Sequence, residues 1–386
     1  MWKGEDQTYM QQAIALAYKG FYSTKPNPAV GCVLVKDDKV IGQGWHHKAG
    51  QPHAEKEALA DALNNAQDVS GSTAYVTLEP CSHHGRTPPC SDALIDAGVS
   101  RVVVAMQDPN PLVGGNGIKR LQNAGIDVQV GLLEKEAYEL NHGFLHRMRT
   151  GLPYVRLKMA SSLDGRTAMA NGESQWITGA DSRVEVHKMR AHAGAVIIGI
   201  GTILADDPSM TVRLDEALLA EMNLSAEEAN PIRVVLDPNL SLPMQAKMLA
   251  LPGRTIVMTS KETVENSLER VEEFHRHGVE LVAVAAQDDK LDIESVLHYL
   301  ADEEQVNDVM VESGAIVAGA FVESGFVNEI HAFVAPVLMG DQAKPMFVLP
   351  SVTNMNDKLQ FSVTDISTFG DDIRMILKPK RHLKSN

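Results

Sequence analysis

Three side chains that can bind a metal ion follow one another over residues 53–90, and their spacing restricts the fold more than any other feature of the sequence. His53 opens a His-Ala-Glu segment, Cys81 closes a Pro-Cys pair, and Cys90 follows after eight intervening residues. One imidazole and two thiolates are three of the four ligands of a tetrahedral zinc site, and an open fourth position is typical of catalytic rather than structural zinc. A structural metal site, or two core cysteines without metal, is the alternative.

Glu55 lies two residues after the first of these ligands and is not itself needed as a ligand. In the zinc deaminases, the metal activates a water molecule and a nearby glutamate moves protons between this water and the leaving amine. The usual spacing there is Pro-Cys-x-x-Cys, whereas residues 82–89 separate the two cysteines here. This insert is polar and basic, so the pattern predicts an amine-hydrolysing zinc site with a loop suited to hold a phosphate.

The composition restricts the class of protein further. A length of 386 residues favours two domains. The net charge of −15 disfavours a nucleic-acid partner but permits local basic clusters around a small phosphate. Three cysteines do not make a disulfide framework, and Cys32, in an apolar run, is expected in the core. The sequence has no signal-peptide pattern and no apolar run of ~20 residues, so we expect a cytoplasmic protein without a membrane partner.

Alternating helical and strand patterns predict a layered α/β domain in the first half of the chain. Helices are expected at residues 6–19, 53–64, 91–98, 118–124 and 134–149, and strands at 30–35, 40–44, 74–78, 101–106 and 128–131. The first two strands form a hairpin, and Asp6 or Thr8 is the expected cap of the first helix. Residues 151–153 break the pattern, so we expect one domain at 1–151 and another at 152–386.

The second half continues as α/β. Strands are expected at residues 154–159, 195–200, 233–237, 255–259, 281–285, 308–312, 329–335 and 374–377, and helices at 214–229 and 316–323. The strand at 195–200 is nearly all apolar, which is typical of the middle of a sheet. Gly199, Gly201 and Gly314 follow apolar strands, where backbone amides and a helix start can hold phosphates. Simple turns are the alternative at these glycines.

Motifs along nearly the whole chain resemble the bifunctional deaminase/reductase family of riboflavin biosynthesis. The motifs are residues 25–31 (KPNPAVG), 53–55 (HAE), 77–90 (TLEPCSHHGRTPPC), 106–111 (MQDPNP), 147–151 (RMRTG), 161–166 (SSLDGR), 174–178 (SQWIT) and 204–208 (LADDP). The insert with two prolines before Cys90 distinguishes the sequence from ordinary cytidine or transfer-RNA deaminases.

The resemblance implies a cytidine-deaminase-like first domain and a dihydrofolate-reductase-like second domain, both α/β. The first would hydrolyse the exocyclic amine of 2,5-diamino-6-ribosylamino-4(3H)-pyrimidinone 5′-phosphate. The second would reduce the ribosyl group of the product to ribityl with NADPH, which gives 5-amino-6-ribitylaminouracil 5′-phosphate. One Zn²⁺ per deaminase site on His53, Cys81 and Cys90, and Glu55 as proton shuttle, follow from the same resemblance.

The substrate contacts that the resemblance implies in the first domain are Asn27, His46, His83 and Arg86. A surface or loop histidine is the alternative for His46 and His83, and a solvated charge is the alternative for Arg86. In the second domain the implied substrate contacts are Ser174, Arg190, Met210, Arg213 and Glu312. The two arginines would pair with the ribose phosphate, or else be ordinary surface charges.

The implied NADPH contacts are Ala160, Trp176, Thr202, Asp206, Gly314, Ala315, Ile316, Val317, Ala318, Gly319 and Ala320. Core packing is the alternative for Trp176. Lys158 and Glu312 are expected on strands, where they would assist ring opening or position the sugar carbon that accepts hydride, or else form a buried ion pair. Ser313 replaces a glycine that the family often has, which alters the expected geometry of the NADPH loop, and Pro238 replaces a small hydroxyl residue.

Two rival functions remain open from the sequence. One is deamination of another nucleobase or nucleotide, with a degenerate reductase domain. The other is a zinc-stabilised nucleotide-binding or regulatory protein without turnover. We expect a small-molecule pyrimidine ribose phosphate as the substrate and a homo-oligomer, dimer or tetramer, as the assembly.

Overall fold

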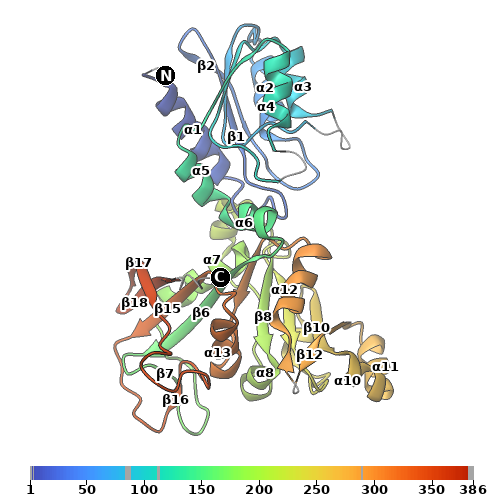
Figure 1. Ribbon diagram of the computed structural model, residues 1–386, viewed down its shortest axis with the longest axis vertical. Coiled ribbons are helices and arrows are strands. Elements are labelled where there is room, and N and C mark those ends of the chain that lie inside the picture. The colour runs from blue at the N-terminus through green and yellow to red at the C-terminus, as the bar shows by residue number, and fades with distance from the viewer. Residues whose placement is uncertain (1, 3, 83–87, 111–113, 288–289, 381–386) are drawn as a thin grey trace. The chain divides into compact units, whose positions relative to one another are not determined.

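The computed structural model describes residues 2, 4–82, 88–110, 114–287 and 290–380 of the chain (Figure 1). The chain forms two compact units, one made of Met1–Leu152 with Ala217–Ser225 and the other of Pro153–Glu216 with Ala226–Asn386. Each unit has its own sheet and its own hydrophobic core.

The first unit alternates helices and strands. Its elements are α1 Asp6–Tyr18, β1 Gly31–Lys36, β2 Lys39–Trp45, α2 Ala54–Asn64, β3 Thr73–Val76, α3 Cys90–Asp96, β4 Arg101–Val104, α4 Asn116–Asn123, β5 Asp127–Val130, α5 Glu134–Leu140 and α6 His142–Thr150. The strand order is β2-β1-β3-β4-β5, in which β1 pairs antiparallel with β2 and β3, while β3, β4 and β5 are parallel. The predicted hairpin is confirmed, and β5 forms one edge of the sheet.

Helices cover both faces of this sheet, because successive side chains of a buried strand point to opposite faces. On β1, Val33 and Val35 pack with α1, α5 and α6, whereas Cys32 and Leu34 pack with α2, α3 and α4. Figure 1 shows α1 and α5 on one side of the sheet and α2, α3 and α4 on the other. The result is a three-layer α/β/α unit, with Cys32 fully buried as predicted.

The single helix predicted at residues 134–149 is wrong, because two helices, α5 and α6, replace it. Asn141 stands between them with φ −122° and ψ 21°, outside the helical region. Its side chain accepts a hydrogen bond from the Ala29 amide (2.8 Å) and donates one to the Ala29 carbonyl oxygen (2.7 Å). This tie to a residue 112 positions away interrupts the helix, and local periodicity cannot reveal it.

The second unit is built on one large sheet. The elements after α6 are β6 Tyr154–Ser162, β7 Arg166–Ala168, α7 Ala180–His192, β8 Ala195–Gly199, α8 Ile200–Asp206, α9 Glu216–Glu221, β9 Ile232–Leu236, η1 Lys247–Ala250, β10 Thr255–Ser260, α10 Lys261–Asn266, α11 Leu268–Arg276, β11 Glu280–Val284, β12 Ala286–Gln287, β13 Lys290–Leu291, α12 Ile293–Asp302, β14 Asp308–Val311, α13 Ala315–Ser324, β15 Glu329–Ala335, β16 Lys344–Pro345, β17 Phe361–Phe369 and β18 Asp372–Pro379.

The strand order in the large sheet is β11-β10-β9-β8-β14-β6-β15-β18-β17. The strands from β11 to β15 run parallel, and β18 and β17 join antiparallel at one edge. The apolar strand β8 lies in the interior of the sheet, between β9 and β14, as predicted. Helix α7 and strand β17, which the sequence analysis does not predict, belong to this unit as well.

The helix predicted at residues 214–229 is also wrong in extent. Only Glu216–Glu221 is helical, and Asn223, just after its end, adopts a left-handed backbone conformation (φ 55°). The Asn223 side chain donates a hydrogen bond to the Lys19 carbonyl oxygen (2.8 Å), and residues Ala217–Ser225 group with the first unit.

Helix α7 begins against a buried carboxylate. Asp372, the first residue of β18, accepts hydrogen bonds from the Gly179 amide (2.7 Å) and the Ser182 hydroxyl (2.6 Å). Gly179 is the N-cap of α7, so a carboxylate distant in sequence takes the place of a local cap and complements the positive end of the helix dipole. This contact fixes α7, which carries Arg190, against the large sheet.

Asp6 does not cap α1, contrary to the sequence expectation, because its side chain is buried and paired. It accepts hydrogen bonds from Arg101 Nη1 and Nη2, both at 2.8 Å, and from the Tyr75 hydroxyl at 2.8 Å. The Asp6 side chain is 1% and that of Arg101 8% exposed. This buried pair links α1 to β3 and β4 in the first unit.

We expect Asp6→Asn to lower the free energy of unfolding by about 3–5 kcal/mol, because it leaves the buried Arg101 guanidinium without its counter-charge. Asp38→Asn, on the exposed turn between β1 and β2, is the matched control and should change stability by less than about 0.5 kcal/mol. Urea unfolding of both full-length variants measures the difference. Equal stability of the two variants would contradict the assigned role of the Asp6–Arg101 pair.

Candidate active sites

The three metal-binding side chains predicted from the sequence come together in the first unit. His53 Nδ1 lies 3.6 Å from Cys81 Sγ and 3.4 Å from Cys90 Sγ, and the three donor atoms lie within 4.8 Å of one another. Zinc bonds of about 2.0–2.1 Å to nitrogen and about 2.3 Å to sulfur give a tetrahedral N···S edge of about 3.6 Å. The three donors therefore fit a zinc ion with its fourth coordination position left for water or substrate.

Two helix starts position these donors. His53 is the N-cap of α2, with an extended backbone (φ −79°, ψ 165°), and Cys90 is the first residue of α3. The Cys90 amide donates a hydrogen bond to Cys81 Sγ (3.2 Å), and the Ser91 amide (3.1 Å) and hydroxyl (3.0 Å) donate to the Cys81 carbonyl oxygen. Cys81 therefore lies beside the start of α3.

These contacts change the acidity of the donors. The pKa of Cys81 is lowered to about 4, because the Cys90 thiol donates a hydrogen bond to it, and His53 and the Cys90 amide add to the effect against burial. The hydrogen bond with Cys81, followed by burial, raises the pKa of Cys90. The hydrogen bond with Cys81 also raises the pKa of His53. At least one sulfur is therefore held as the thiolate that metal ligation requires.

Glu55 lies in the first turn of α2 and is only 3% exposed. Burial, followed by the charge of Cys81, raises the pKa of Glu55 to about 7, while the charge of His53 acts in the opposite direction. Its carboxyl group also forms a hydrogen bond with the Cys90 side chain. A buried carboxyl that titrates near neutral pH, beside the metal donors, can both accept and donate a proton.

His46 and Asn27 form a hydrogen-bonded chain that leads to the first metal donor. Asn27 Nδ2 lies 3.0 Å from His46 Nε2, and His46 Nδ1 lies 3.0 Å from the carbonyl oxygen of Pro52, which directly precedes His53. Because an amide nitrogen donates and a carbonyl oxygen accepts, His46 is neutral with its proton on Nδ1. Burial lowers the pKa of His46 in agreement. The alternative of a surface histidine is wrong for His46, which is buried.

Glu79, two residues before Cys81, is a positioning residue that the sequence analysis misses. Its carboxylate accepts hydrogen bonds from four backbone amides, those of Asp108 (3.2 Å), Gly115 (2.8 Å), Gly117 (2.9 Å) and Ile118 (3.2 Å). A Cβ atom at Gly117 would lie 1.9 Å from the Pro80 carbonyl oxygen, so only glycine permits this approach. The start of α4 is thereby fixed against the segment that carries Cys81.

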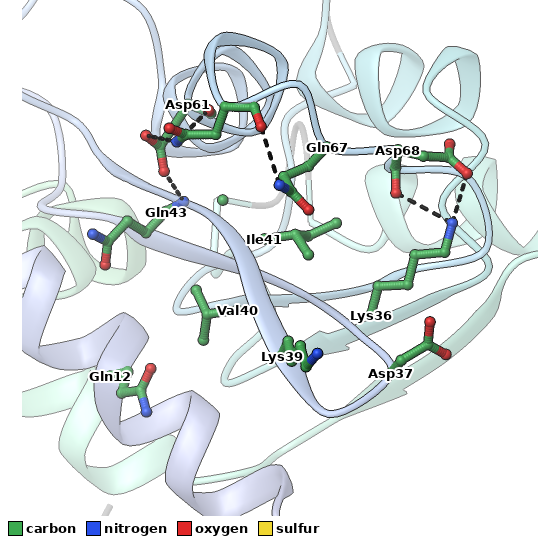
Figure 2. A pocket seen from close by; sticks show the side chains of 12 residues that line it. Gln12, Lys36, Asp37, Lys39, Val40, Ile41, Gln43, Asp61, Gln67 and Asp68 are labelled. Atoms are coloured by element: carbon green, nitrogen blue, oxygen red, sulfur yellow. Dashed lines mark hydrogen bonds and ion pairs between the residues drawn. The ribbon is translucent and has the colours of Figure 1, made fainter.

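Two of the predicted substrate contacts, His83 and Arg86, lie outside the described residues. A separate open groove of about 950 Å³ runs along the β1–β2 hairpin and the adjoining face of α2 (Figure 2). Its lining includes the Lys36–Asp68 ion pair and Asp61, which accepts a hydrogen bond from the Gln43 amide, as Figure 2 shows. The lining residues do not include the metal donors, so this groove is distinct from the candidate metal site.

The second unit gathers a cluster of largely buried charges beside the middle of β6 and the end of β14. Glu312, directly after β14, forms an ion pair with Arg190 of α7, in which Arg190 Nη2 lies 2.9 Å from Glu312 Oε2. Arg190 is therefore not a surface charge, and it, rather than Lys158, is the ion-pair partner of Glu312. Burial lowers the pKa of Lys158 on β6, against the opposing charge of Glu312, and the charge of Arg190 lowers it further.

Histidine 187 joins this cluster and is missed by the sequence analysis. It lies on α7 one turn before Arg190, and its ring nitrogen Nδ1 is 3.2 Å from the Arg213 amide. The predicted contact Arg213 is exposed, whereas Met210 is buried with a left-handed backbone conformation (φ 51°). An isolated histidine within a helix gives no motif, so only the structure brings it beside the other residues.

The predicted NADPH contacts of the second unit come from neighbouring segments. The Gly314 amide donates a hydrogen bond to Thr202 Oγ1 (3.0 Å), and the Ser174 hydroxyl donates one to Asp206 Oδ1 (3.2 Å). Gly199 is the N-cap of α8 and Gly314 that of α13, so both are helix starts at the ends of adjacent parallel strands. Simple turns are therefore not the explanation for these two glycines.

The surface around these segments suits a dinucleotide. Gly314, the N-cap of α13, offers no side-chain cap, which leaves amides of the first helical turn for a phosphate. Ile316 is 72% and Trp176 67% exposed, so core packing is wrong for Trp176, whose ring lies under the Arg183 guanidinium. The remaining residues of the 314–320 segment continue along α13, and Ala160 lies half-buried on β6.

The helices of the described chain include none that is long and apolar enough to cross a membrane.

Comparison with known proteins covers both units. Residues 3–106 match the family described as cytidine and deoxycytidylate deaminase zinc-binding region, and residues 153–375 match the family described as RibD C-terminal domain. These matches confirm the predicted order of a cytidine-deaminase-like domain followed by a reductase domain of the RibD type, both in α/β units. A zinc-binding deaminase region and a reductase domain are also consistent with the predicted cofactors Zn²⁺ and NADPH.

Full-length relatives show the same order of domains. The chain is 46% identical to riboflavin biosynthesis protein RibD of Escherichia coli, over 96% of this chain and 98% of the relative. Among solved structures, Acinetobacter baumannii RibD matches with a TM-score of 0.87 and 47% identity, over 98% of this chain and 99% of that one. The diaminohydroxyphosphoribosylaminopyrimidine deaminase/5-amino-6-(5-phosphoribosylamino)uracil reductase of Thermotoga maritima matches with a TM-score of 0.83 and 35% identity, over 97% and 98%. The chain therefore belongs to the RibD family of riboflavin biosynthesis proteins, with a deaminase zinc-binding region followed by a RibD C-terminal domain.

Proposed function

We propose that the chain catalyses two consecutive steps of riboflavin biosynthesis. Residues 1–151 remove the exocyclic amine of 2,5-diamino-6-ribosylamino-4(3H)-pyrimidinone 5′-phosphate as ammonia, and residues 152–386 reduce the ribosyl group of the product to ribityl with NADPH. The observation that carries the proposal is the set of three donors at the spacing of a zinc tetrahedron, with the buried carboxyl of Glu55 beside them. Membership of the RibD family supports the order of the two steps.

In the deaminase step, His53, Cys81 and Cys90 would hold the zinc ion, which would supply an acidified water molecule as the nucleophile. Glu55 would move a proton from the attacking water to the amine that leaves as ammonia, which a carboxyl with a pKa of about 7 can do in either direction. Asn27 and His46 bind the substrate beside the metal, and their hydrogen bonds also hold the backbone before His53. His83 and Arg86 complete the proposed substrate contacts.

In the reductase step, bound NADPH would supply the hydride that the first carbon of the sugar accepts as its bond to the ring oxygen breaks. The ring oxygen needs a proton, and the Lys158 ammonium, whose pKa is lowered by burial, is the proposed source. Glu312 with Arg190, Ser174, Met210 and Arg213 line the substrate.

The dinucleotide binds along the second unit at Ala160, Trp176, Thr202, Asp206 and the 314–320 segment, where the start of α13 faces a phosphate. The proposal also includes a cytoplasmic location and a dimer or tetramer of the chain. Sedimentation of the purified protein measures the assembly directly.

A two-step assay on the purified chain tests the proposed function. With the diaminopyrimidine phosphate alone, we expect release of one equivalent of ammonia. With NADPH added, we expect the oxidation of one equivalent of NADPH, visible as a loss of its absorbance. Ammonia release without NADPH oxidation would favour a deaminase with a degenerate reductase domain, and the absence of both would favour a binding or regulatory protein.

Glu55→Gln should keep its zinc but lose ammonia release by about 10²–10⁴-fold, because the amide can neither take up nor return the proton. Reduction of the deaminated intermediate should be unchanged. Glu57→Gln, on the same helix but only half-buried, is the matched control and should keep both activities. Zinc content by metal analysis and ammonia by a coupled assay are the measurements; near-normal ammonia release by Glu55→Gln would remove Glu55 from the proton transfer.

Lys158→Met should lower kcat for reduction of the deaminated intermediate by at least about 10²-fold, with ammonia release unchanged. Because the protonated amine is the active form and its pKa is lowered, kcat of the unsubstituted protein should fall as pH rises through a value below the ordinary lysine pKa. Lys188→Met, on α7, is the control and should retain this pH profile. If kcat of the Lys158→Met variant fell with rising pH in the same way as that of the unsubstituted protein, another group would donate the proton.

A further inference from the structure

His187 is a buried side chain without a part in the proposed chemistry. It is 8% exposed and lies on α7 one turn before Arg190, on the face that packs against residues 210–213. Its neighbours are charged, because Arg190, Arg213, Glu312 and Lys158 all act on it electrostatically. His187 is therefore a buried histidine within a charged cluster, and its hydrogen bond identifies the segment that it holds in place.

Two side chains of α7 hold the segment that ends in Arg213. Arg190 Nη1 donates a hydrogen bond to the Thr211 carbonyl oxygen (3.1 Å), and the Arg213 amide donates one to His187 Nδ1 (3.2 Å). Between them, the Val212 amide donates to Asn230 Oδ1 (2.8 Å). The segment begins at Met210, whose left-handed backbone makes it irregular, so these side-chain contacts replace the regular backbone pairing it lacks.

The hydrogen bond to the Arg213 amide also determines the state of the His187 ring. A backbone amide can only donate, so Nδ1 carries a lone pair and the proton of the neutral ring is on Nε2. Burial, followed by the charges of Arg190 and Arg213, lowers the pKa of His187 to about 4, against the opposing charge of Glu312. The ring therefore remains an acceptor at neutral pH.

We infer that His187 is a positioning residue of the reductase site, which fixes the Arg213 main chain so that its exposed guanidinium is presented to the phosphate of the substrate. The inference rests on the proposed function, in which Arg213 binds the ribose phosphate. It explains why a neutral acceptor lies beside Arg190 and Arg213. A cationic side chain has no acceptor for the Arg213 amide, and a carboxylate would accept it but offset the positive charge that binds phosphate. His187 itself does not contact the reacting atoms.

The test compares His187→Leu with His187→Asn in reduction of the deaminated intermediate. Leu removes the acceptor, whereas the Asn side-chain oxygen can stand near the position of Nδ1. We expect Leu to raise KM for the phosphorylated substrate by ~2- to 10-fold, the loss of one hydrogen bond, with kcat within about two-fold. KM for NADPH and ammonia release should be unchanged, and Asn should restore KM to within about two-fold of the unsubstituted value.

The dephosphorylated intermediate separates this role from a merely structural one. On that substrate, His187→Leu and the unsubstituted protein should have the same KM, because no phosphate is left for Arg213 to bind. An unchanged KM for the phosphorylated substrate, or an equal rise on both substrates, would overturn the inference. If His187→Leu does not fold, His187→Gln takes its place, because the Gln side-chain oxygen reaches the position of Nε2 rather than that of Nδ1. We then expect a higher KM for His187→Gln than for His187→Asn. A KM of His187→Gln that is no higher than that of His187→Asn would overturn the inference. Failure of the unsubstituted protein to oxidise NADPH would instead refute the proposed function.

Discussion

The proposed chemistry of the first unit depends on holding one nitrogen and two sulfurs at three corners of a zinc tetrahedron. Like-charged sulfurs repel, so the arrangement needs compensation from the protein. The Cys90 amide donates to Cys81 Sγ, and the raised pKa of the Cys90 thiol lets it share a proton with its neighbour. Zinc binding would displace this proton, which is how metal binding couples to protonation.

The surroundings of the donors explain why this geometry is precise enough for chemistry. Each donor is held through its backbone: His53 through the Pro52 carbonyl oxygen bonded to His46, and Cys81 through the start of α3 and the amides bound by Glu79. The contacts around ligands orient them and tune their basicity. Asn27 and His46 therefore combine two roles, since they hold the metal ligand and lie where the substrate is proposed to bind.

The second unit holds three charged side chains, Lys158, Arg190 and Glu312, close together. Burying Lys158, Arg190 and Glu312 together is costly unless the charges compensate one another, and the Arg190–Glu312 pair does this while Lys158 keeps a lowered pKa. An amine that loses its proton more readily than an exposed lysine is suited to donate it. This arrangement supports the proposed role of Lys158 as the proton donor of the reductase step.

The sequence predicts those parts of the protein that depend on residues near one another in the chain. The hairpin at Gly31–Trp45 and the apolar strand in the interior of the large sheet are correct because periodicity is a local signal. The spacing of His53, Cys81 and Cys90 also predicts that these side chains lie close together, as they do. The errors all involve distant partners. Asn141 interrupts a helix to reach Ala29, and Asp6 pairs with Arg101 instead of capping α1. His187 joins the reductase cluster only through the packing of α7, so no sequence motif marks it.

X-ray absorption at the zinc edge of the purified protein tests the central claim most directly. We predict two sulfur ligands at about 2.3 Å and two nitrogen or oxygen ligands at about 2.0–2.1 Å, which are one imidazole and one water molecule. A shell of four sulfurs, a shell without sulfur, or active protein that contains no metal would contradict the assignment of His53, Cys81 and Cys90 as the ligands of a catalytic zinc ion.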